Sequence, residues 1–523
     1  GGGSAGWMTA AFLSKAMPEG VDIELVESRT ISSIGVGEAT FSDIHLFFEF
    51  LGLPEDEWMP ECNASYKVAI RFVNWNAERR DFYHPFQRFE LVQGRRIIEW
   101  WLKLNRDARF DRACFTVPAI CDAQRSPRYL DGRAFDSRID GQLGPSKAGE
   151  KAVLIEDLHV QYPYAYHFDA SLLAKFLSGF AKRRGVSHVL DDVTKVNQSE
   201  DGFIKSITTK EHGDIAGDLF IDCTGFRGLL INEVLNEPFM SFSESLPCDR
   251  AVAMQVPSDR EKEGINPYTT ATALSAGWVW NIPLYHRVGT GYVYCSAFLS
   301  PEEAEREFRE HLGRRSEGCR ASHIKMRVGR NRNSWVKNCV AIGLSSGFVE
   351  PLESTGIFFI HHAVEQLVSY FPRKRFEEES IKSYNKIIGN CIDGVREFLT
   401  VHYVASTRRD TEFWRATQTE LIIPDELRER LRLWKHRLPT DRTIKSDYHG
   451  FPAYSYCVIL LGMGYRPEHC LPLLDYGDDT LASAAFDRIR AKTEQLTASL
   501  PCLFDYLKVK YGESDSRISS VAS

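Results

Sequence analysis

The sequence has no run of about 18 apolar residues, the length that a membrane-spanning helix needs. It also has no stretch with the composition of a secretory signal peptide. Charge of one sign is not in large excess, because the 523 residues carry a formal net charge of −7 at pH 7. A mildly acidic balance disfavours nucleic acids and anionic membranes as partners. We therefore expect a soluble, cytoplasmic protein that binds neither nucleic acid nor membrane.

Close cysteine pairs are also missing, although the chain contains 12 cysteines. Cys114 and Cys121 are the closest two, and a zinc site needs the tighter Cys-x-x-Cys spacing. Scattered cysteines of this kind are typical of free, buried thiols in a reducing compartment. We therefore expect no metal site.

The composition itself is ordinary for a globular protein, with 43% hydrophobic and 26% charged residues. A chain of 523 residues is long for one compact core. We therefore expect an extended α/β domain with an added lobe. Residues 513–523 are small and polar and are expected to form a flexible tail.

The chain opens on Gly-Gly-Gly-Ser-Ala-Gly, the glycine turn of a dinucleotide-binding site. A helix expected over residues 7–17 would supply N–H donors for a pyrophosphate. Glu27 closes the next expected strand, residues 21–26, at the distance of a ribose-binding acid. The motif favours FAD or NAD over NADP, and a tight turn without a ligand is the alternative. Such a turn follows a β-strand, so we expect a native first strand ahead of Gly1.

Apolar periodicity divides the remaining chain into regions. Alternation predicts one strand over residues 64–75, with Lys67 inside it. Residues 76–160 have the composition of irregular loops, and the chain is mainly helical beyond residue 372. The predicted modules are a discontinuous dinucleotide-binding module of residues 1–60, 165–240 and 325–371, a substrate region of 61–164 and 241–324, and a helical lobe of 372–512.

Two tryptophans spaced two apart, Trp278 and Trp280, lead to Ile282 and Pro283. Alternate side chains of a strand share a face, so both rings are expected on one side of a sheet. By itself, this pattern predicts a wall of the hydrophobic core.

The pattern W-x-W-x-I-P nevertheless resembles a motif of flavin-dependent halogenases, where it keeps the substrate away from the flavin. A second pattern of that family, F-x-x-P-x-x-S-x-G, matches Phe348, Pro351, Ser354 and Gly356. Together with the glycine turn, these patterns occur in the family's order, and the likeness to tryptophan halogenases covers essentially the whole chain. The resemblance implies a mixed α/β fold, with a Rossmann-like FAD-binding domain and a mostly helical C-terminal substrate lobe.

The resemblance also implies the reaction. FADH2 would come from a flavin reductase, which is a separate protein. With FADH2, O2 would oxidise chloride or bromide to hypohalous acid. The acid would then halogenate the indole ring of free L-tryptophan by electrophilic substitution.

The family's essential lysine aligns with Lys67, which would hydrogen-bond hypohalous acid or carry the halogen as a haloamine. Without that alignment, a lone lysine is a solvated residue. The family's acid aligns with Glu353, which would take the ring proton or orient the halogenating species. The alternative for Glu353 is a helix-terminal acid. Halide contacts fall on Thr355 and Gly356, where backbone N–H groups are free, and plain N-capping by Thr355 is compatible with that role.

The remaining site residues also follow from the resemblance. The FAD contacts are Gly1, Gly2, Gly3, Ala5, Gly6, Glu27, Ser28, Ile31, Val36, Ala39, Val193, Leu344 and Ile357. The substrate contacts are His84, Phe86, Glu353, Ser354, Tyr448, Tyr454 and Ser455. His84 and Phe86 would clamp the indole, although His84 alone would be a satisfied surface or core histidine. Tyr456 stands where relatives have a tryptophan, which leaves the contacts to the amino-acid end open.

Several segments resemble the tryptophan 5-halogenase branch, so we expect substitution at C5 of the indole. The resemblance to the family also implies a homodimer. The alternatives within the fold are a tryptophan 6- or 7-halogenase and a halogenase of another indole, another aromatic ring or a carrier-bound pyrrole. An FAD-dependent aromatic monooxygenase would need a nicotinamide site and would not need Lys67. A flavoprotein used only for binding would use neither Lys67 nor Glu353.

Overall fold

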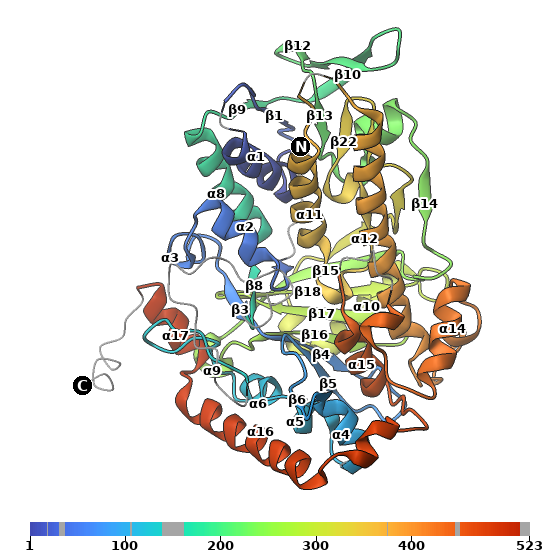
Figure 1. Cartoon of the computed structure of the whole chain (residues 1–523). Helices are drawn as coiled ribbons and strands as arrows, with labels where there is room; N and C mark the ends of the chain where they lie inside the picture. The colour runs from blue at the N-terminus through green and yellow to red at the C-terminus, as the bar shows by residue number, and fades with distance from the viewer. Residues whose placement is uncertain are drawn as a thin grey trace.

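A seven-stranded sheet crosses the middle of the molecule in the computed structural model (Figure 1), which describes residues 1–17, 19–30, 37–104, 107–138, 162–373, 375–444 and 450–512. β16 and β4 run parallel, and the other neighbouring strands run antiparallel. The strand order is β19 (Ser322–Lys325), β15 (Arg250–Pro257), β18 (Arg287–Tyr294), β17 (Gly277–Pro283), β16 (Tyr268–Ala273), β4 (Ala69–Val73) and β5 (Phe82–Pro85). The sheet thus joins strands from both parts of the predicted substrate region.

Above this sheet in Figure 1, segments far apart in the sequence meet around α1 (Ser4–Ala16). α1 packs against α8 (Ala170–Arg183) and α11 (Gly356–Ser369). The parallel pairs beside these helices are β1 (Glu24–Glu27) with β9 (Ser187–Leu190) and β13 (Phe220–Asp222) with β22 (Cys339–Ala341). Parallel strands covered by helices are the arrangement of dinucleotide-binding domains. The expected mixed α/β fold is confirmed, while the division into modules stays a prediction.

The expected single strand over residues 64–75 is wrong. It is two strands, β3 (Ser65–Lys67) and β4, which belong to different sheets. β3 pairs with β8 (Ala165–Phe168), which also pairs with β2 (Glu38–Ala39). The break falls at Val68, whose backbone N–H donates to the oxygen of Pro267 at 2.7 Å. Lys67 is therefore the last residue of a short strand beside the large sheet.

The C-terminal part is mainly helical, as the periodicity predicts. The long α12 (Glu378–Val404) packs against α11, and α15 (Ala453–Gly462) packs against both α12 and β5. The other helices are α13 (Glu412–Thr419), α14 (Asp425–Trp434), α16 (Asp479–Ser499) and α17 (Leu503–Lys510). α15 and α12 thereby bring the lobe against the sheet edge that β5 forms (Figure 1).

The description of residues 76–160 as irregular is wrong for part of that stretch. Three helices form there, namely α4 (Ile97–Leu104), α5 (Phe110–Cys114) and α6 (Val117–Asp122). They pack against α16, more than 350 positions later in the chain. α5 and α6 are too short to show a 3.6-residue period, and neither has a capping side-chain hydrogen bond at its first turn. Tertiary packing, not local propensity, accounts for α5 and α6.

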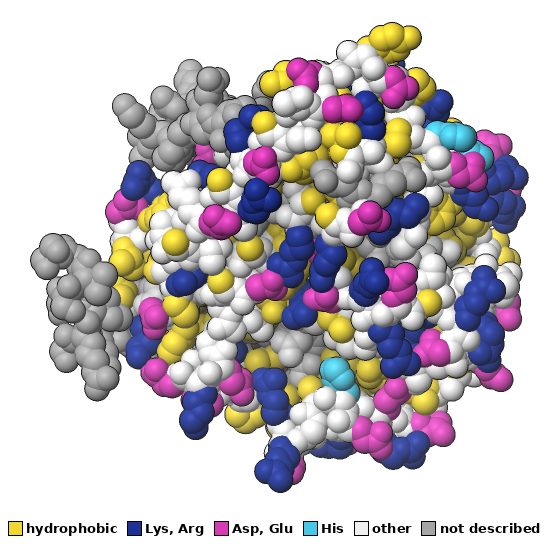
Figure 2. Space-filling view, turned by 90° about the horizontal axis from the view of Figure 1, so that it is seen from below, with side chains coloured by type: hydrophobic (Ala, Val, Ile, Leu, Met, Phe, Trp, Pro, Cys, Tyr) yellow, Lys and Arg dark blue, Asp and Glu magenta, His cyan; other side chains and the backbone are white. Residues whose placement is uncertain are grey.

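The lower face of the molecule mixes charges of both signs. Figure 2 shows Lys and Arg side chains interspersed with Asp and Glu, without a broad field of one sign. Within the described parts of the chain, no helix is both long and apolar enough to cross a membrane.

Candidate active site

Lys67 is buried at the end of β3. Its Nζ donates hydrogen bonds to the backbone oxygen of Thr40 at 2.9 Å and to Oγ of Ser354 at 2.8 Å. The ring centroid of Phe86 lies 5.1 Å from Nζ. Burial lowers the pKa of Lys67 from 10.5 to about 7, against the opposing charge of Glu353. This lysine can therefore be a neutral amine at neutral pH, which a solvated lysine cannot.

Glu353 is a buried acid held between two histidines. Its two oxygens each lie 3.1 Å from Nδ1 of His84, and Oε1 lies 2.9 Å from Nε2 of His402. Although burial alone would raise the pKa of this carboxyl, His84 and His402 lower it from 4.5 to about 2. Glu353 is thus a carboxylate that the surrounding histidines keep charged.

Glu353 and Ser354 are consecutive but contact different partners, and the turn that carries them explains why. Pro351 begins a short 3-10 turn that ends at Glu353, and Ser354 then adopts a left-handed backbone with φ of 63°. A non-glycine residue in that region costs about 1–3 kcal/mol, a strain that surrounding contacts must hold in place. This backbone lets Ser354 meet Lys67 while Glu353 meets the histidines.

Aromatic and polar residues predicted to hold the substrate meet around His84. Nε2 of His84 lies 3.0 Å from Oγ of Ser455 on α15, and the Tyr454 ring centroid is 5.9 Å from that of His84. Tyr448 lies outside the described residues. Tyr456 faces away from this group, since its ring contacts Phe398 and Trp434 instead.

A cavity of about 810 Å³ opens beside the glycine turn. The close approach of backbone segments there requires glycine, because a Cβ on Gly2 would lie 1.9 Å from the carboxyl carbon of Glu27. A Cβ on Gly1 would lie 2.2 Å from the oxygen of Cys223. The volume falls within the range of about 300–1,000 Å³ that is typical of ligand and cofactor sites. The geometry fits a dinucleotide cofactor.

Most of the residues predicted to bind FAD line this cavity. They are Gly1, Gly2, Gly3, Ala5, Glu27, Ser28, Ala39, Val193, Leu344 and Ile357. Gly6 does not line it but packs against the backbone of Gly1. Ile31 and Val36 lie outside the described residues. Glu38 and Asp192 also line the cavity, although no sequence motif predicts them there, and burial raises the pKa of Glu38 to about 7.

The two tryptophans of the W-x-W-x-I-P pattern have different roles. Trp280 lines the cavity, and its ring lies over Gly291 of β18, where a Cβ would be 2.2 Å from the ring. The indole N–H of Trp278 donates to Glu350 at 3.1 Å. Their ring centroids are 6.4 Å apart. The pattern therefore links the cavity wall to a second buried acid, which the sequence analysis missed.

The N-terminus of α11 faces the same cavity through Gly356. The side chain of Thr355 does not cap the helix, and its buried Oγ1 has no hydrogen-bond partner among the described residues. Plain N-capping by Thr355 is therefore not what the structure shows. A Cβ added to Gly356 would meet no atom within 4 Å, so the space beside this glycine is open.

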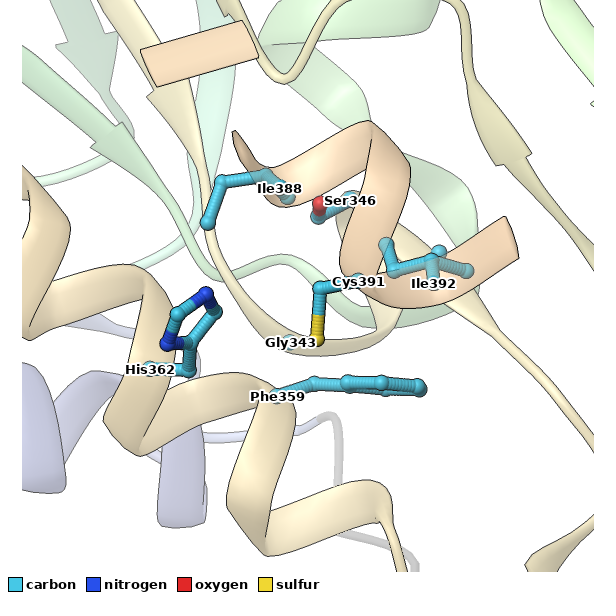
Figure 3. Close-up of a pocket in the computed structure, with 8 residues that line it drawn as sticks. Gly343, Ser346, Phe359, His362, Ile388, Cys391 and Ile392 are labelled. Atoms are coloured by element: carbon cyan, nitrogen blue, oxygen red, sulfur yellow. The ribbon is translucent and has the colours of Figure 1, made fainter. Parts of the chain in front are cut away.

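A second, much smaller cavity lies between α11 and α12 (Figure 3). Its volume of about 10 Å³ is the room of one water molecule. Phe359 and His362 line it from α11, Cys391 lines it from α12, and Gly343 lines it from the loop after β22. A space of this size excludes a cofactor or an indole ring.

Ser354 connects the lysine with the large cavity, since it lines the cavity and accepts a hydrogen bond from Lys67. The structure thus brings together Lys67, Glu353, Ser354, His84 and Phe86, as the sequence predicts. His402 joins them from α12, and sequence reasoning missed it because its spacing from Glu353 carries no motif.

Comparison with known proteins gives a consistent result. The family model described as tryptophan halogenase matches residues 1–141 and 145–479. The chain is 52% identical to tryptophan 6-halogenase SttH of Streptomyces toxytricini, over 97% of this chain and 96% of that protein. It is 51% identical to 7-chloro-L-tryptophan 6-halogenase KtzR of Kutzneria sp. (strain 744), over 97% and 98%. The solved structure of Tar14, a tryptophan C-6 flavin-dependent halogenase from taromycin biosynthesis, superimposes with a TM-score of 0.91 at 51% identity, over 98% of each chain.

Proposed function

Because this chain belongs to the flavin-dependent tryptophan halogenase family, we propose that it chlorinates or brominates C6 of the indole ring of free L-tryptophan. As a member, it is an oxidoreductase that uses FAD as FADH2 and halide as a co-substrate. The observation that carries the proposal is Lys67, a buried amine that is hydrogen-bonded to Ser354 of the cavity wall and lies beside the ring of Phe86.

FAD is assigned to the cavity of about 810 Å³. The glycine turn and the N-terminus of α1 would face the pyrophosphate, and Glu27 would bind a ribose hydroxyl. When bound, the reduced flavin supplies the activation of O2 that oxidises halide to hypohalous acid. The flavin reductase that provides FADH2 is a separate protein in this family. A homodimer and a cytoplasmic location stay predictions.

The halide is assigned to the start of α11. The free N–H groups of Thr355 and Gly356 and the positive end of the helix favour an anion. The unpartnered Oγ1 of Thr355 supports this placement, because a buried hydroxyl without a partner is costly. A halide there would lie against the same cavity as the flavin.

Lys67 would hold the halogenating species close to the indole. In its protonated form, Nζ can donate a hydrogen bond to hypohalous acid. In its neutral form, the lone pair of Nζ can displace hydroxide from the halogen to give a haloamine, and the released hydroxide takes up the amine proton to leave as water. A pKa of about 7 makes both forms available at neutral pH.

Glu353 would accept the proton from the ring carbon that has gained the halogen. The electron pair of that C–H bond returns to the ring and restores its aromaticity. Glu353 is available for this because it is already ionised, and although its pKa of about 2 makes it a weak base, the proton of the cationic ring intermediate is strongly acidic. The clamp of His84 and Phe86 would fix the plane of the indole.

The choice of C6 replaces the expectation of C5. That expectation rested on the resemblance of a few segments, and the comparisons give it no support. SttH and Tar14 are described as acting at C6 of tryptophan, and KtzR at C6 of 7-chloro-L-tryptophan. These three relatives share about half of the residues of this chain, which favours C6.

The test is incubation with FAD, a general flavin reductase, NADH, O2, L-tryptophan and either chloride or bromide. We expect a monohalogenated product that needs both halide and reductase. Its proton NMR spectrum decides the position. H4, identified by its proximity to the side-chain methylene, has an ortho coupling in a 6-halogenated product and only a meta coupling in a 5-halogenated one. A 6-halogenated product also keeps H7, with only a meta coupling, whereas a 7-halogenated product has no H7. A hydroxylated product without dependence on halide would overturn the halogenase assignment.

A further inference from the structure

Two exposed histidines and one carboxylate meet on the surface of the helical lobe. His436 follows α14, and Glu468 and His469 lie in the segment after α15. A ring nitrogen of each histidine and a carboxylate oxygen of Glu468 all lie within 4.8 Å of one another. Within the described parts of the chain, this is the one group of His, Cys, Asp or Glu side chains whose ligand atoms are close enough to hold a metal ion.

The carboxylate of Glu468 connects the two rings. Its Oε2 lies 2.6 Å from Nδ1 of His436 and 4.0 Å from Nε2 of His469. The rings themselves are nearly parallel, with 16° between their planes and 6.2 Å between their centroids. The same carboxylate oxygen is therefore near one nitrogen of each ring.

The backbone holds the two segments together at this point. The N–H of Glu468 donates to the oxygen of Lys435 at 2.9 Å, and the N–H of His469 donates to the oxygen of His436 at 3.3 Å. The positions of the three side chains are thus set by the fold before any ion binds. A ligand that binds a preformed group loses less free energy to ordering than one that must assemble it.

Two imidazoles and a carboxylate are ligands that suit Zn²⁺. In a tetrahedral site with ligands about 2.0–2.2 Å from the ion, neighbouring ligand atoms are about 3.3 Å apart. The separations of 2.6 and 4.0 Å lie on either side of that value. The side chains of His436, Glu468 and His469 are 54%, 58% and 66% exposed, so rotation about their side-chain bonds can adjust these separations without moving the backbone.

We propose that His436, Glu468 and His469 form a Zn²⁺ site that joins the end of α14 to the segment after α15, with water in the fourth position. The ion would take the place of the hydrogen bond between His436 and Glu468. The site is separate from the proposed halogenase chemistry, because none of its three residues lines the cavity assigned to FAD. Zn²⁺ that binds the folded chain would stabilise the lobe.

Cysteine spacing gives no sign of this site, because its ligands are histidine and glutamate. The adjacent pair Glu468 and His469 is no motif by itself, and His436 is about 30 positions away in the chain. Only the packing of the two segments brings the third ligand to the pair. Zn²⁺ binding here would make the expectation of no metal site wrong.

Zinc binding is measured by titration calorimetry with zinc chloride, on the full chain without a histidine tag. We expect one Zn²⁺ per chain at this site. Mg²⁺ and Ca²⁺, which prefer oxygen ligands, should not bind there. The melting temperature should rise with Zn²⁺ and return to its starting value when EDTA is added.

Single variants locate the site. His436→Gln and His469→Gln should each weaken Zn²⁺ binding by more than the roughly 10–100-fold that loss of a hydrogen-bond partner of a metal ligand costs. Both should also lose the Zn²⁺-dependent rise in melting temperature. Because both rings are more than half exposed, the variants should melt like the wild type in EDTA and keep its halogenation rate.

Two control variants test whether all three ligands are needed and whether a thiol binds instead. His323→Gln removes an exposed histidine whose Nε2 is 2.8 Å from Glu305, a pair outside the three-residue group, and should bind Zn²⁺ like the wild type. Cys470→Ser, next to His469, should also bind normally. The proposal is overturned by an absence of Zn²⁺ binding, by wild-type affinity in both His436→Gln and His469→Gln, or by a loss of binding in Cys470→Ser alone.

Discussion

Nζ of Lys67 and Oγ of Ser354 are 2.8 Å apart, and Ser354 also lines the cavity assigned to FAD. One hydrogen bond therefore separates the cofactor compartment from the buried amine. Ser354 reaches both because its backbone is left-handed, with φ of 63°. A halogenating species formed in the cavity would thus lie close to the amine of Lys67. The indole would bind on the other side of this amine, against His84 and Phe86.

The first prediction concerns Lys67 and activity. Lys67→Ala should retain FAD binding, because Lys67 is not among the residues that line the cavity, and should lose halotryptophan formation. Product is measured by chromatography and FAD affinity by fluorescence. Lys103→Ala, a partly buried lysine that pairs with Asp479, is the control and should be active. Turnover above a few per cent in Lys67→Ala would remove the lysine from the mechanism.

Burial of Lys67 should also lower the free energy of unfolding of the protein at pH 7. Its folded-state pKa of about 7 lies below the ordinary 10.5, so the unfolded chain binds more protons between these values. The stability of the wild type therefore rises with pH across that window. Lys67→Met removes the buried ammonium and should raise the free energy of unfolding at pH 7 by on the order of a few kcal/mol.

Denaturant unfolding of the wild type and Lys67→Met at two pH values checks this sign. The advantage of the variant should shrink between pH 7 and pH 9, because the wild-type lysine is neutral in the folded state and the cost of removing its proton on folding falls as the pH approaches 10.5. A constant difference would mean that packing of the methionine, not the charge, is responsible.

Residues that belong to a local motif can be predicted from the sequence, whereas features that depend on contacts between distant residues cannot. Lys67, Glu353, Thr355 and Gly356 follow from aligned motifs, and the glycine turn follows from its spacing. The break at Val68 does not, because apolar alternation continues through it and its N–H is bonded to Pro267, about 200 residues away.

The sequence also does not predict in which direction each side chain of a short helix points. Tyr454, Ser455 and Tyr456 are consecutive on α15, so their side chains point about 100° apart. Ser455 reaches His84, while Tyr456 packs on Phe398 and Trp434. The sequence predicts Tyr454 and Ser455 as substrate contacts and leaves the role of Tyr456 open, and only the packing of α15 against α12 and β5 decides which of these side chains reach His84.

Glu353 is expected to assist the reaction strongly. Glu353→Gln should lower the rate of product formation by about 10²–10⁴, the usual contribution of general-base catalysis. The oxidation of reduced flavin by O2, followed by absorbance in a stopped-flow instrument, should be unchanged. Glu365→Gln, on α11, serves as the control. An unchanged single-turnover rate in Glu353→Gln would exclude this acid from proton removal.

The start of α11 should bind halide. Crystals soaked in bromide should show an anomalous peak next to the backbone nitrogens of Thr355 and Gly356. Gly356→Ala should fold normally, since its Cβ would meet no atom within 4 Å, but the methyl group would occupy the open space. We expect a raised KM for chloride with intact stability. Anomalous density confined to the protein surface would contradict the site.

The last prediction concerns the wall between the cavity and the tryptophan pair. A Cβ at Gly291 would lie 2.2 Å from the ring of Trp280, and Trp280 lines the cavity. Gly291→Ala should therefore push the indole toward the flavin space and weaken FAD binding, because a strand in the middle of the sheet cannot shift to make room. Adding Trp280→Phe removes the atoms in conflict and should restore part of the affinity, measured by flavin fluorescence. The control is Trp280→Phe alone, which keeps the glycine. Equal FAD affinity in Gly291→Ala and the wild type would show that Trp280 moves elsewhere, and a double variant no better than Gly291→Ala would trace the loss to the strand instead of the ring.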